Sequence, residues 1–240
     1  MKNTNRKHFS YDTVNMLWQG DMSIGPYLVI DGKKTKTFLF AFIDDCSRVV
    51  PYAAFTLTEK FEALRNIFKE ALIRRGIPKI VYVDNGKIYR SDAFHIACAS
   101  LGITLTHTKP YDAASKGKIE RFFGTVKTRF FPLIKHQPPS SLEKLNQRFW
   151  QWLEEDYHRK VHASLGMTPL DLFLSQASKV RMVEDPASLD PIFLRREQRK
   201  VKHDGTISLM GRFLKYLASL WAKESKFVMM RKRSMFMKMA

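Results

Sequence analysis

Apolar and polar positions alternate along the first part of the chain in the manner of β-strands. Three short runs, at 16–22, 37–43 and 48–55, are rich in aromatic and β-branched residues. Turn signals such as Asp31-Gly32 separate these runs, and the stretch before position 16 is polar. This pattern predicts an antiparallel meander of three strands.

Helical periodicity and short strand-like runs alternate in the next part of the chain. Apolar residues recur every three or four positions in the helical stretches, and two short β-rich runs lie between them. In chain order we expect a helix at 58–75, a strand at 79–83, a helix at 91–101, a strand at 103–106, and helices at 116–130 and 140–157. The complete order predicts an α/β domain with a mixed central sheet flanked by helices.

Three acidic residues are notable because of the elements that hold them. Asp21 falls in the first strand, Asp84 directly after the strand at 79–83, and Glu120 in the helix at 116–130. If the first and fourth strands are neighbours, a helix crossing their ends can bring the glutamate onto both aspartates. Crowded carboxylates repel one another unless cations neutralise them, and oxygen ligands suit Mg²⁺ or Mn²⁺. We therefore predict that these three are catalytic residues binding two divalent ions for displacement at phosphorus.

Each of these signals also has a plain structural explanation. The sequence Asp84-Asn85-Gly86 is a common turn, and Asp44 and Asp45 compete with Asp21 as the acid of the first strands. A glutamate with lysines on the same helix face, such as Glu120, is often simply solvated. The hypothesis therefore rests on the three acids taken together.

Four basic residues accompany the predicted glutamate. Lys116 and Lys127 fall on the same helical face as Glu120, and Lys118 and Arg121 lie beside it in the sequence. Basic side chains around a metal-bound phosphate can hold the neighbouring phosphates of a DNA strand. We predict that these four residues contact DNA.

The charge balance supports a polyanionic partner. The chain has 41 Lys and Arg against 23 Asp and Glu, a formal net charge of +18. Positions 212–240 contribute eight basic residues and one acid, or +7, which leaves +11 for the rest. Such an excess favours nucleic acid, because each neutralised phosphate releases condensed counterions.

Composition excludes several classes of protein. A hydrophobic fraction of 45% is ample for a packed core, and no apolar run approaches the roughly 18–20 residues of a membrane helix. The N-terminus lacks the apolar stretch of a signal peptide. Cys46 and Cys98 lie in apolar runs without metal-binding spacing, which indicates buried thiols in a reducing compartment. We expect a soluble, cytoplasmic protein with no membrane partner.

Four segments resemble the catalytic core of the retroviral-integrase superfamily, and especially that of bacterial insertion-sequence transposases. They are Trp18–Asp21, Phe42–Arg48, Val81–Gly86 and Lys116–Arg121. The 35 residues between Asp84 and Glu120 (positions 85–119) match a spacing typical of this superfamily. The likeness extends over about 15–173.

The resemblance implies an RNase H-like fold and a DDE-type polynucleotidyl transferase. Such enzymes carry out metal-dependent cleavage at transposon ends, followed by strand transfer into target DNA. Asp21, Asp84 and Glu120 are the implied metal ligands. Family members act as multimers, so we expect a homo-oligomer associated with the nucleoid of a bacterium.

The histidines at 158 and 162 raise the question of zinc. They are four residues apart, but no second pair of ligands has suitable spacing. The segments 157–162 and 164–169 instead resemble the part that closes the superfamily core. We therefore do not expect zinc.

The same likeness suggests a domain organisation. We expect a linker at 1–15, the core at 16–175, a second linker at 176–193 and a partial C-terminal segment at 194–240. The last segment resembles the start of the small β-barrel that follows the core in Mu-like transposases. A basic linker with one hairpin is an equal alternative.

Two features depart from the family pattern. Only about fifteen residues precede the first strand, too few for the helix-turn-helix domain that usually recognises element ends. After Arg212 strand periodicity is lost and the tail is rich in Met and Lys, which suggests a change of reading frame. A basic tail for nucleic acid or a membrane surface is the alternative.

Two other functions stay open at this point. One is a plain nuclease on the same fold. The other is a truncated DNA-binding remnant that inhibits the full-length enzyme or has no activity.

Overall fold

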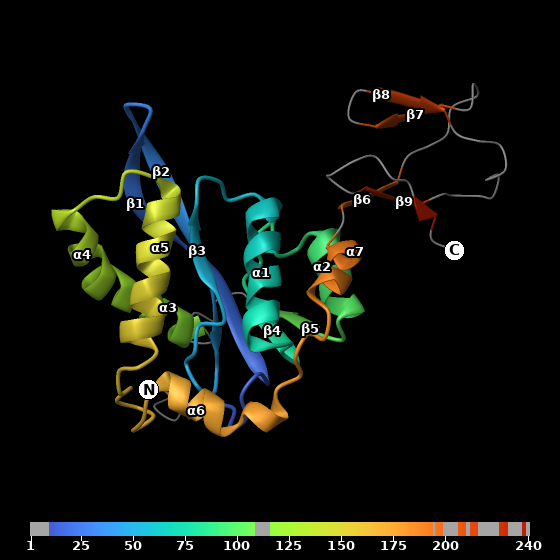
Figure 1. The fold of residues 1–240 in the computed structure, drawn as a ribbon. Coiled ribbons are helices and arrows are strands. Elements are labelled where there is room, and N and C mark those ends of the chain that lie inside the picture. The colour runs from blue at the N-terminus through green and yellow to red at the C-terminus, as the bar shows by residue number, and fades with distance from the viewer. Residues whose placement is uncertain are drawn as a thin grey trace, which may run out of the picture. The chain divides into compact units, whose positions relative to one another are not determined.

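The computed structural model describes residues 10–108 and 116–193, and beyond them the backbone of five short strands. The chain divides into two compact units, 1–184 and 185–240. In the first unit a sheet lies between helices (Figure 1). None of the helices in the described residues is long and apolar enough to span a membrane.

A five-stranded mixed sheet forms the middle of the first unit, in the order β3-β2-β1-β4-β5. Its strands are Leu17–Ile30 (β1), Lys33–Asp44 (β2), Ala53–Thr56 (β3), Ile80–Val83 (β4) and Thr104–His107 (β5). Antiparallel pairing joins β1 to β2 and β2 to β3, whereas β4 runs parallel to β1 and to β5. The predicted mixed sheet, with the first strand in the centre and the fourth beside it, is confirmed.

Four of the helices described in the first unit fall where helical periodicity predicted them, and two more, Phe131–His136 (α4) and Pro169–Ser175 (α6), were not predicted. The four are Phe61–Arg75 (α1), Asp92–Ser100 (α2), Gly117–Thr125 (α3) and Leu142–Trp152 (α5). Two π-helical turns, Val126–Phe130 and Leu153–Tyr157, extend α3 and α5. Ser91 caps α2 and Ser141 caps α5, each accepting a backbone N–H through its hydroxyl.

Alternating residues of β2 build a core on each face of the sheet. Leu39, Ala41 and Ile43 pack into a cluster with α3, α4 and α5. Phe40 and Phe42 point to the other face, since neighbouring side chains of a strand alternate. The ring centroid of Phe42 there lies 5.0 Å from that of Phe68 in α1, and Figure 1 shows α1 and α3 on opposite sides of the sheet.

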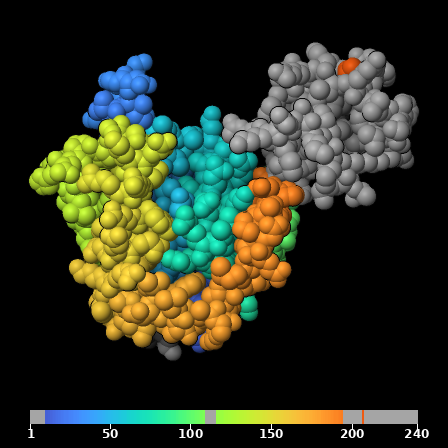
Figure 2. All heavy atoms as spheres, viewed as in Figure 1, coloured from blue at the N-terminus to red at the C-terminus, as the bar shows by residue number. Residues whose placement is uncertain are grey.

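The strand lengths differ from the prediction in two places. β1 and β2 continue into a long hairpin whose far end projects beyond the helices (Figure 2). The outer part of β2 is polar and exposed, whereas that of β1 carries apolar residues of which Ile24, Tyr27 and Val29 are exposed and Leu28 is buried. β3 starts only at Ala53, five residues later than predicted, because Arg48 adopts a φ of 65° that a strand cannot contain.

A buried carboxylate closes the turn between β2 and β3. The Asp44 side chain accepts hydrogen bonds from the backbone N–H of Asn15 at 2.8 Å and from both the N–H and the hydroxyl of Ser47 at 2.7 Å. Burial raises the pKa of Asp44, against the effect of these donors. All of its partners belong to the fold, so Asp44 has a structural role.

The described part of the second unit holds one short α-helix, Leu189–Ile192 (α7), preceded by a 3-10 turn at Pro186–Ser188, and five strands. The strands are Arg195–Gln198 (β6), Thr206–Leu209 (β7), Arg212–Lys215 (β8), Lys226–Met229 (β9) and Met237–Lys238 (β10). They form one sheet in the order β10-β9-β6 and a second of β7 and β8. Most of the segments between them lie outside the described residues, so the partial barrel and the change of reading frame stay predictions.

Candidate functional site

The pairing of β1 with β4 places two of the predicted acids side by side. The parallel register joins Leu17 to Ile80 and Gln19 to Tyr82. Continued by two residues, the same register sets Asp21 beside Asp84. The sequence anticipated this neighbourhood from the order of the elements alone.

A tight turn after β4 fixes Asp84. Its Oδ1 accepts the backbone N–H of Gly86 at 2.7 Å, and a Cβ at position 86 would lie only 2.8 Å from that oxygen. A glycine is therefore required for this close approach. The Asp84 carbonyl accepts from Nδ1 of His107 at 2.8 Å, and the Asn85 amide donates to the Thr108 carbonyl at 2.8 Å. These bonds tie the turn to β5.

A single ammonium group bridges the two aspartates. Nζ of Lys116 lies 2.7 Å from Oδ2 of Asp21 and 3.7 Å from Oδ2 of Asp84. Lys116 is buried, with 7% of its surface exposed. Burial raises the pKa of Asp21 above its ordinary value, although the hydrogen bond to Lys116 opposes the effect. The lysine therefore stands where crowded carboxylates need a cation.

Glu120 is not grouped with Asp21 and Asp84. It is exposed on α3, four residues after Lys116 and thus on the same side of the helix. Within the described residues, no three His, Cys, Asp or Glu side chains are grouped closely enough to hold a metal ion. The structure thus brings together Asp21 and Asp84, with Glu120 about one helical turn beyond the lysine that contacts both.

A buried glutamine fastens α3 to the central strand. Oε1 of Gln19 accepts the backbone N–H of Ile119 at 3.2 Å, and its amide donates to Oδ1 of Asp45 at 3.2 Å. Nζ of Lys118 pairs with the same Asp45 carboxylate. Gln19 and Asp45 were not among the predicted site residues. The signal available was that Gln19 shares a strand face with Asp21, two residues away.

The predicted DNA-binding residues occupy three different environments. Lys116 is buried on the aspartates, and Lys118 is part-buried against Asp45. Arg121 is exposed and lines a pocket on another side of α3, and Lys127 is exposed. Only the last two therefore present free surface in this arrangement.

Two buried polar atoms beside the aspartates lack partners among the described residues. They are the hydroxyl of Tyr89 and Nε2 of His107. The pKa of Tyr89 lies well above its ordinary value because of burial and then because of the charges of Asp21 and Asp84. Buried polar atoms without a protein partner are commonly bonded to ordered water. Asp21 and Asp84 supply carboxylate oxygens, the ligand type that a hydrated divalent ion takes, and Glu120 is not grouped with them in the described residues.

Comparisons with known proteins relate this chain to transposases and integrases. The family described as the TnsB C-terminal domain matches residues 22–136, slightly less than half of the chain. The chain is 30% identical over 199 residues to a candidate transposase for insertion sequence element IS5376 from Geobacillus stearothermophilus. It is 27% identical over 211 residues to the transposase for transposon Tn552 from Staphylococcus aureus. The chain is similar to proteins of the transposase/integrase family.

These matches leave part of each relative uncovered. The match to the IS5376 relative covers 77% of the present chain and 46% of the relative. The match to the Tn552 transposase covers 80% of the present chain and 44% of the relative. The chain thus spans about half the length of the curated relatives that it matches.

A solved structure extends the likeness to the fold. The HTLV-2 integrase catalytic core domain in complex with magnesium superposes with a TM-score of 0.54 at 23% identity. The superposition covers 67% of the present chain and 97% of the HTLV-2 integrase domain. At this identity the likeness shows the fold, and the predicted RNase H-like fold is confirmed.

Proposed function

We propose that this chain is the catalytic core of a transposase, which uses divalent metal ions to cleave DNA at transposon ends and to join those ends to target DNA. The observation that carries the proposal is the convergence of Asp21 and Asp84 on the single ammonium of Lys116. Neighbouring carboxylates with a cation between them are a natural site for Mg²⁺ or Mn²⁺. The similarity to known transposases supports the same reaction class.

The proposed metal ligands are Asp21, Asp84 and Glu120. When bound, one or two divalent ions would activate the attacking hydroxyl and stabilise the leaving oxygen of an in-line displacement at phosphorus. Gly86 and His107 hold the Asp84 turn, and Gln19 holds the first turn of α3, so each acidic residue is carried on an anchored backbone. This anchoring limits the motion needed to a change of side chains.

Lys116 has two successive roles in this proposal. In the present arrangement it neutralises Asp21 and contacts Asp84. Asp21 and Asp84 would hold a divalent ion in place of the ammonium, because like charges repel. Glu120, on the same side of α3, would add a carboxylate ligand, and Lys116 would be free to neutralise a DNA phosphate.

DNA is the proposed partner, both as transposon ends and as target. The net charge of +18 and the exposed basic residues Arg121 and Lys127 on the helix that carries Glu120 support this assignment. A homo-oligomer that brings two ends together belongs to the same proposal. The solved integrase cores that this chain resembles include a dimeric form and a trimeric form.

Strand transfer by point variants tests the catalytic assignment. Purified Asp84→Asn and Glu120→Gln should bind an oligonucleotide carrying an element end as well as wild type does. They should form at least about a thousandfold less joined product with Mg²⁺, a loss of about 4 kcal/mol of transition-state stabilisation. Asp31→Asn, on the exposed hairpin turn, is the matched control and should retain activity. Full activity in either active-site variant would remove the assignment.

One observation favours a second candidate, a DNA-binding protein without catalysis. Glu120 is not grouped with Asp21 and Asp84 in the described residues. Wild-type protein that binds the element end but yields no nicked or joined product with Mg²⁺ or Mn²⁺ would support this candidate. Nicked product without joined product would instead indicate a plain nuclease.

A further inference from the structure

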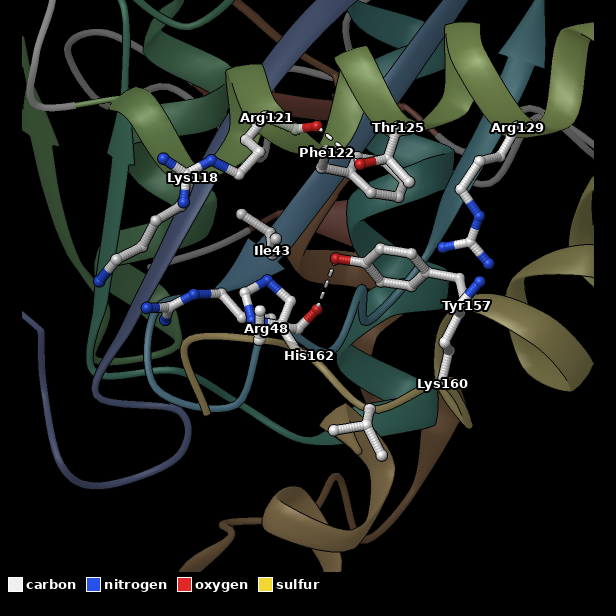
Figure 3. A pocket seen from close by; sticks show the side chains of 12 residues that line it. Ile43, Arg48, Lys118, Arg121, Phe122, Thr125, Arg129, Tyr157, Lys160 and His162 are labelled. Carbon is white, nitrogen blue, oxygen red and sulfur yellow. Dashed lines mark hydrogen bonds between the residues drawn. The ribbon is translucent and has the colours of Figure 1, made fainter. Parts of the chain in front are cut away.

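A second basic site lies on a different side of α3 from Lys116 and Glu120. It is a pocket of about 170 Å³ between α3 with its π-helical turn, the end of β2 with the following turn, and the segment 157–163. Figure 3 shows Arg121, Thr125 and Arg129 on the helix side of the pocket and Arg48, Lys160 and His162 across from them. The helix residues are four apart and therefore share one face.

The lining of this pocket carries more positive charge than the nearby acids neutralise. Five Lys or Arg side chains and one histidine line it. Lys118 pairs with Asp45 and Arg129 pairs with Asp156. Among the described residues no carboxylate lies within ion-pair distance of the other three cations, Arg48, Arg121 and Lys160. The pocket therefore has a net excess of positive charge.

Arg48 is held in the pocket at a conformational cost. It is 9% exposed and has a φ of 65°, which is unfavourable for a residue other than glycine. The Tyr157 hydroxyl donates to its carbonyl at 3.2 Å, and its guanidinium donates to the Cys46 carbonyl at 3.2 Å. A buried arginine with no carboxylate within ion-pair distance is expensive to maintain, which points to a ligand.

The electrostatic effects within the pocket agree with a site for an anion. Burial lowers the pKa of Arg48, against the opposing effect of Asp45 and Asp44. The pKa of His162 is lowered by burial and then by the charges of Arg48 and Arg121. The two arginines thus disfavour a charge on His162, and an anion among the three would relieve that repulsion.

We propose that this pocket binds one phosphodiester group of a DNA backbone, separate from the phosphate that reacts at the aspartates. Guanidinium groups are suited to this ligand because their planar donors match phosphate oxygens in pairs. Arg121 and Glu120 are neighbours on α3, so one DNA strand can reach the pocket and the proposed metal site together. The inference rests on the proposed function in one respect, that DNA is the substrate.

The salt dependence of DNA binding tests the pocket. Arg121→Gln with Lys160→Gln removes two exposed pocket cations without leaving a paired carboxylate uncompensated. Lys144→Gln with Lys179→Gln, two exposed lysines outside the pocket, removes the same charge as a matched control. For a DNA duplex, the slope of log Kobs against log [salt] should fall in magnitude by about 0.9 in the pocket variant, the value for one phosphate contact. Equal losses in both variants would overturn the proposal.

Neutral linkages in the DNA give a second and sharper readout. Single methylphosphonates placed along the strand should weaken binding by wild type at one or two positions close to the reacting phosphate. At those positions the pocket variant should show no further loss, because its contact is already gone. Independent, additive losses at every position would overturn the proposal. If the double variant melts below wild type, Lys160→Gln alone replaces it in both assays.

Free phosphate is the alternative source of the same chemistry. If millimolar inorganic phosphate raises the melting temperature of wild type but not of the pocket variant, while the DNA salt slopes of the two are equal, the pocket serves free phosphate and the proposal fails. The results distinguish failure of the pocket proposal from failure of the proposed function. If the pocket variant shows no further loss at the sensitive methylphosphonate positions but no Mg²⁺-dependent product forms, only the catalytic assignment fails. If product forms but the losses are additive at every position, only the pocket proposal fails.

Discussion

Two acidic pairs on neighbouring strands of this protein have opposite characters. Asp44 and Asp45 end β2, while Asp21 and Asp84 lie side by side on β1 and after β4. Burial raises the pKa of both Asp44 and Asp21, so a raised pKa does not distinguish a structural aspartate from a functional one here.

The identity of the partners does separate Asp44 from Asp21 and Asp84. Both carboxylate oxygens of Asp44 accept hydrogen bonds from backbone N–H groups or a serine hydroxyl, which cannot leave without unfolding the turn. Asp21 and Asp84 each use Oδ1 for a backbone N–H, but their Oδ2 atoms share a lysine side chain that can swing away. An oxygen whose partner can be replaced is available to a ligand, whereas the two oxygens of Asp44 are not.

The largest effect on stability is expected at Asp44. Asp44→Asn places an amide NH₂ against the donors of Ser47 and should lower the free energy of unfolding by about 3 kcal/mol. Asp84→Asn keeps an acceptor for Gly86 and should change it by less than about 0.5 kcal/mol. Urea denaturation of both variants, with Asp31→Asn as the exposed control, measures the contrast. Equal losses at Asp44 and Asp84 would erase the distinction between the pairs.

Removal of the shared lysine should have an intermediate effect. Lys116→Met keeps the aliphatic stem but removes the competing charge, so the affinity for Mn²⁺ should rise about tenfold, or about 1.4 kcal/mol. Calorimetric titration with Mn²⁺ measures this directly. Lys127→Met, on the exposed side of the same helical segment, is the control and should leave the affinity unchanged. Unchanged or weaker binding in Lys116→Met would show that the lysine does not occupy the metal position.

The smallest expected effect concerns His158, a buried side chain whose partners, like those of Asp44, belong to the fold. Nε2 of His158 accepts the backbone N–H of Val50 at 3.0 Å, so the proton of the neutral ring is on Nδ1, which lies 3.3 Å from Glu154. Burial lowers the pKa of His158, against the opposing effect of Glu154.

The sign of the pH effect follows from that lowered pKa. Below the unfolded value of about 6.5 the unfolded chain takes up a proton that the folded chain excludes, so stability falls as the pH falls. His158→Gln keeps an acceptor for Val50 but cannot titrate. Between pH 7.5 and 5.5 wild type should therefore lose about 1 kcal/mol more than the variant in urea denaturation. Parallel pH profiles would contradict this.

The sequence predicted the fold because strong local signals agreed with one another. The apolar stripe Ile119, Phe122, Val126 and Phe130 lies in the core as its spacing required. The outer half of the β1–β2 hairpin was missed because Gly25 and Pro26 interrupt the run in β1 and the facing residues of β2 are polar. The late start of β3 depends on the conformation of Arg48, which no periodicity encodes.

The site was predictable only as a set of backbone positions. The order of the strands placed Asp21 beside Asp84, and the helical repeat placed Lys116 and Glu120 on one side of α3. Whether the lysine or the glutamate reaches the aspartates depends on side-chain conformation and burial, which spacing does not determine. The roles of Gln19, Tyr89 and His107 arise from contacts between distant segments, so single-sequence patterns could not reveal them.

The lysine between the aspartates also sets a selectivity rule for small cations. An ammonium carried by the chain itself competes at an effective concentration on the order of millimolar or higher. Potassium ions or simple amines, with one charge each, gain little by exchanging with Lys116. A dication that contacts both carboxylates gains twice the charge, so this pair can discriminate by valence without a closed cage of ligands.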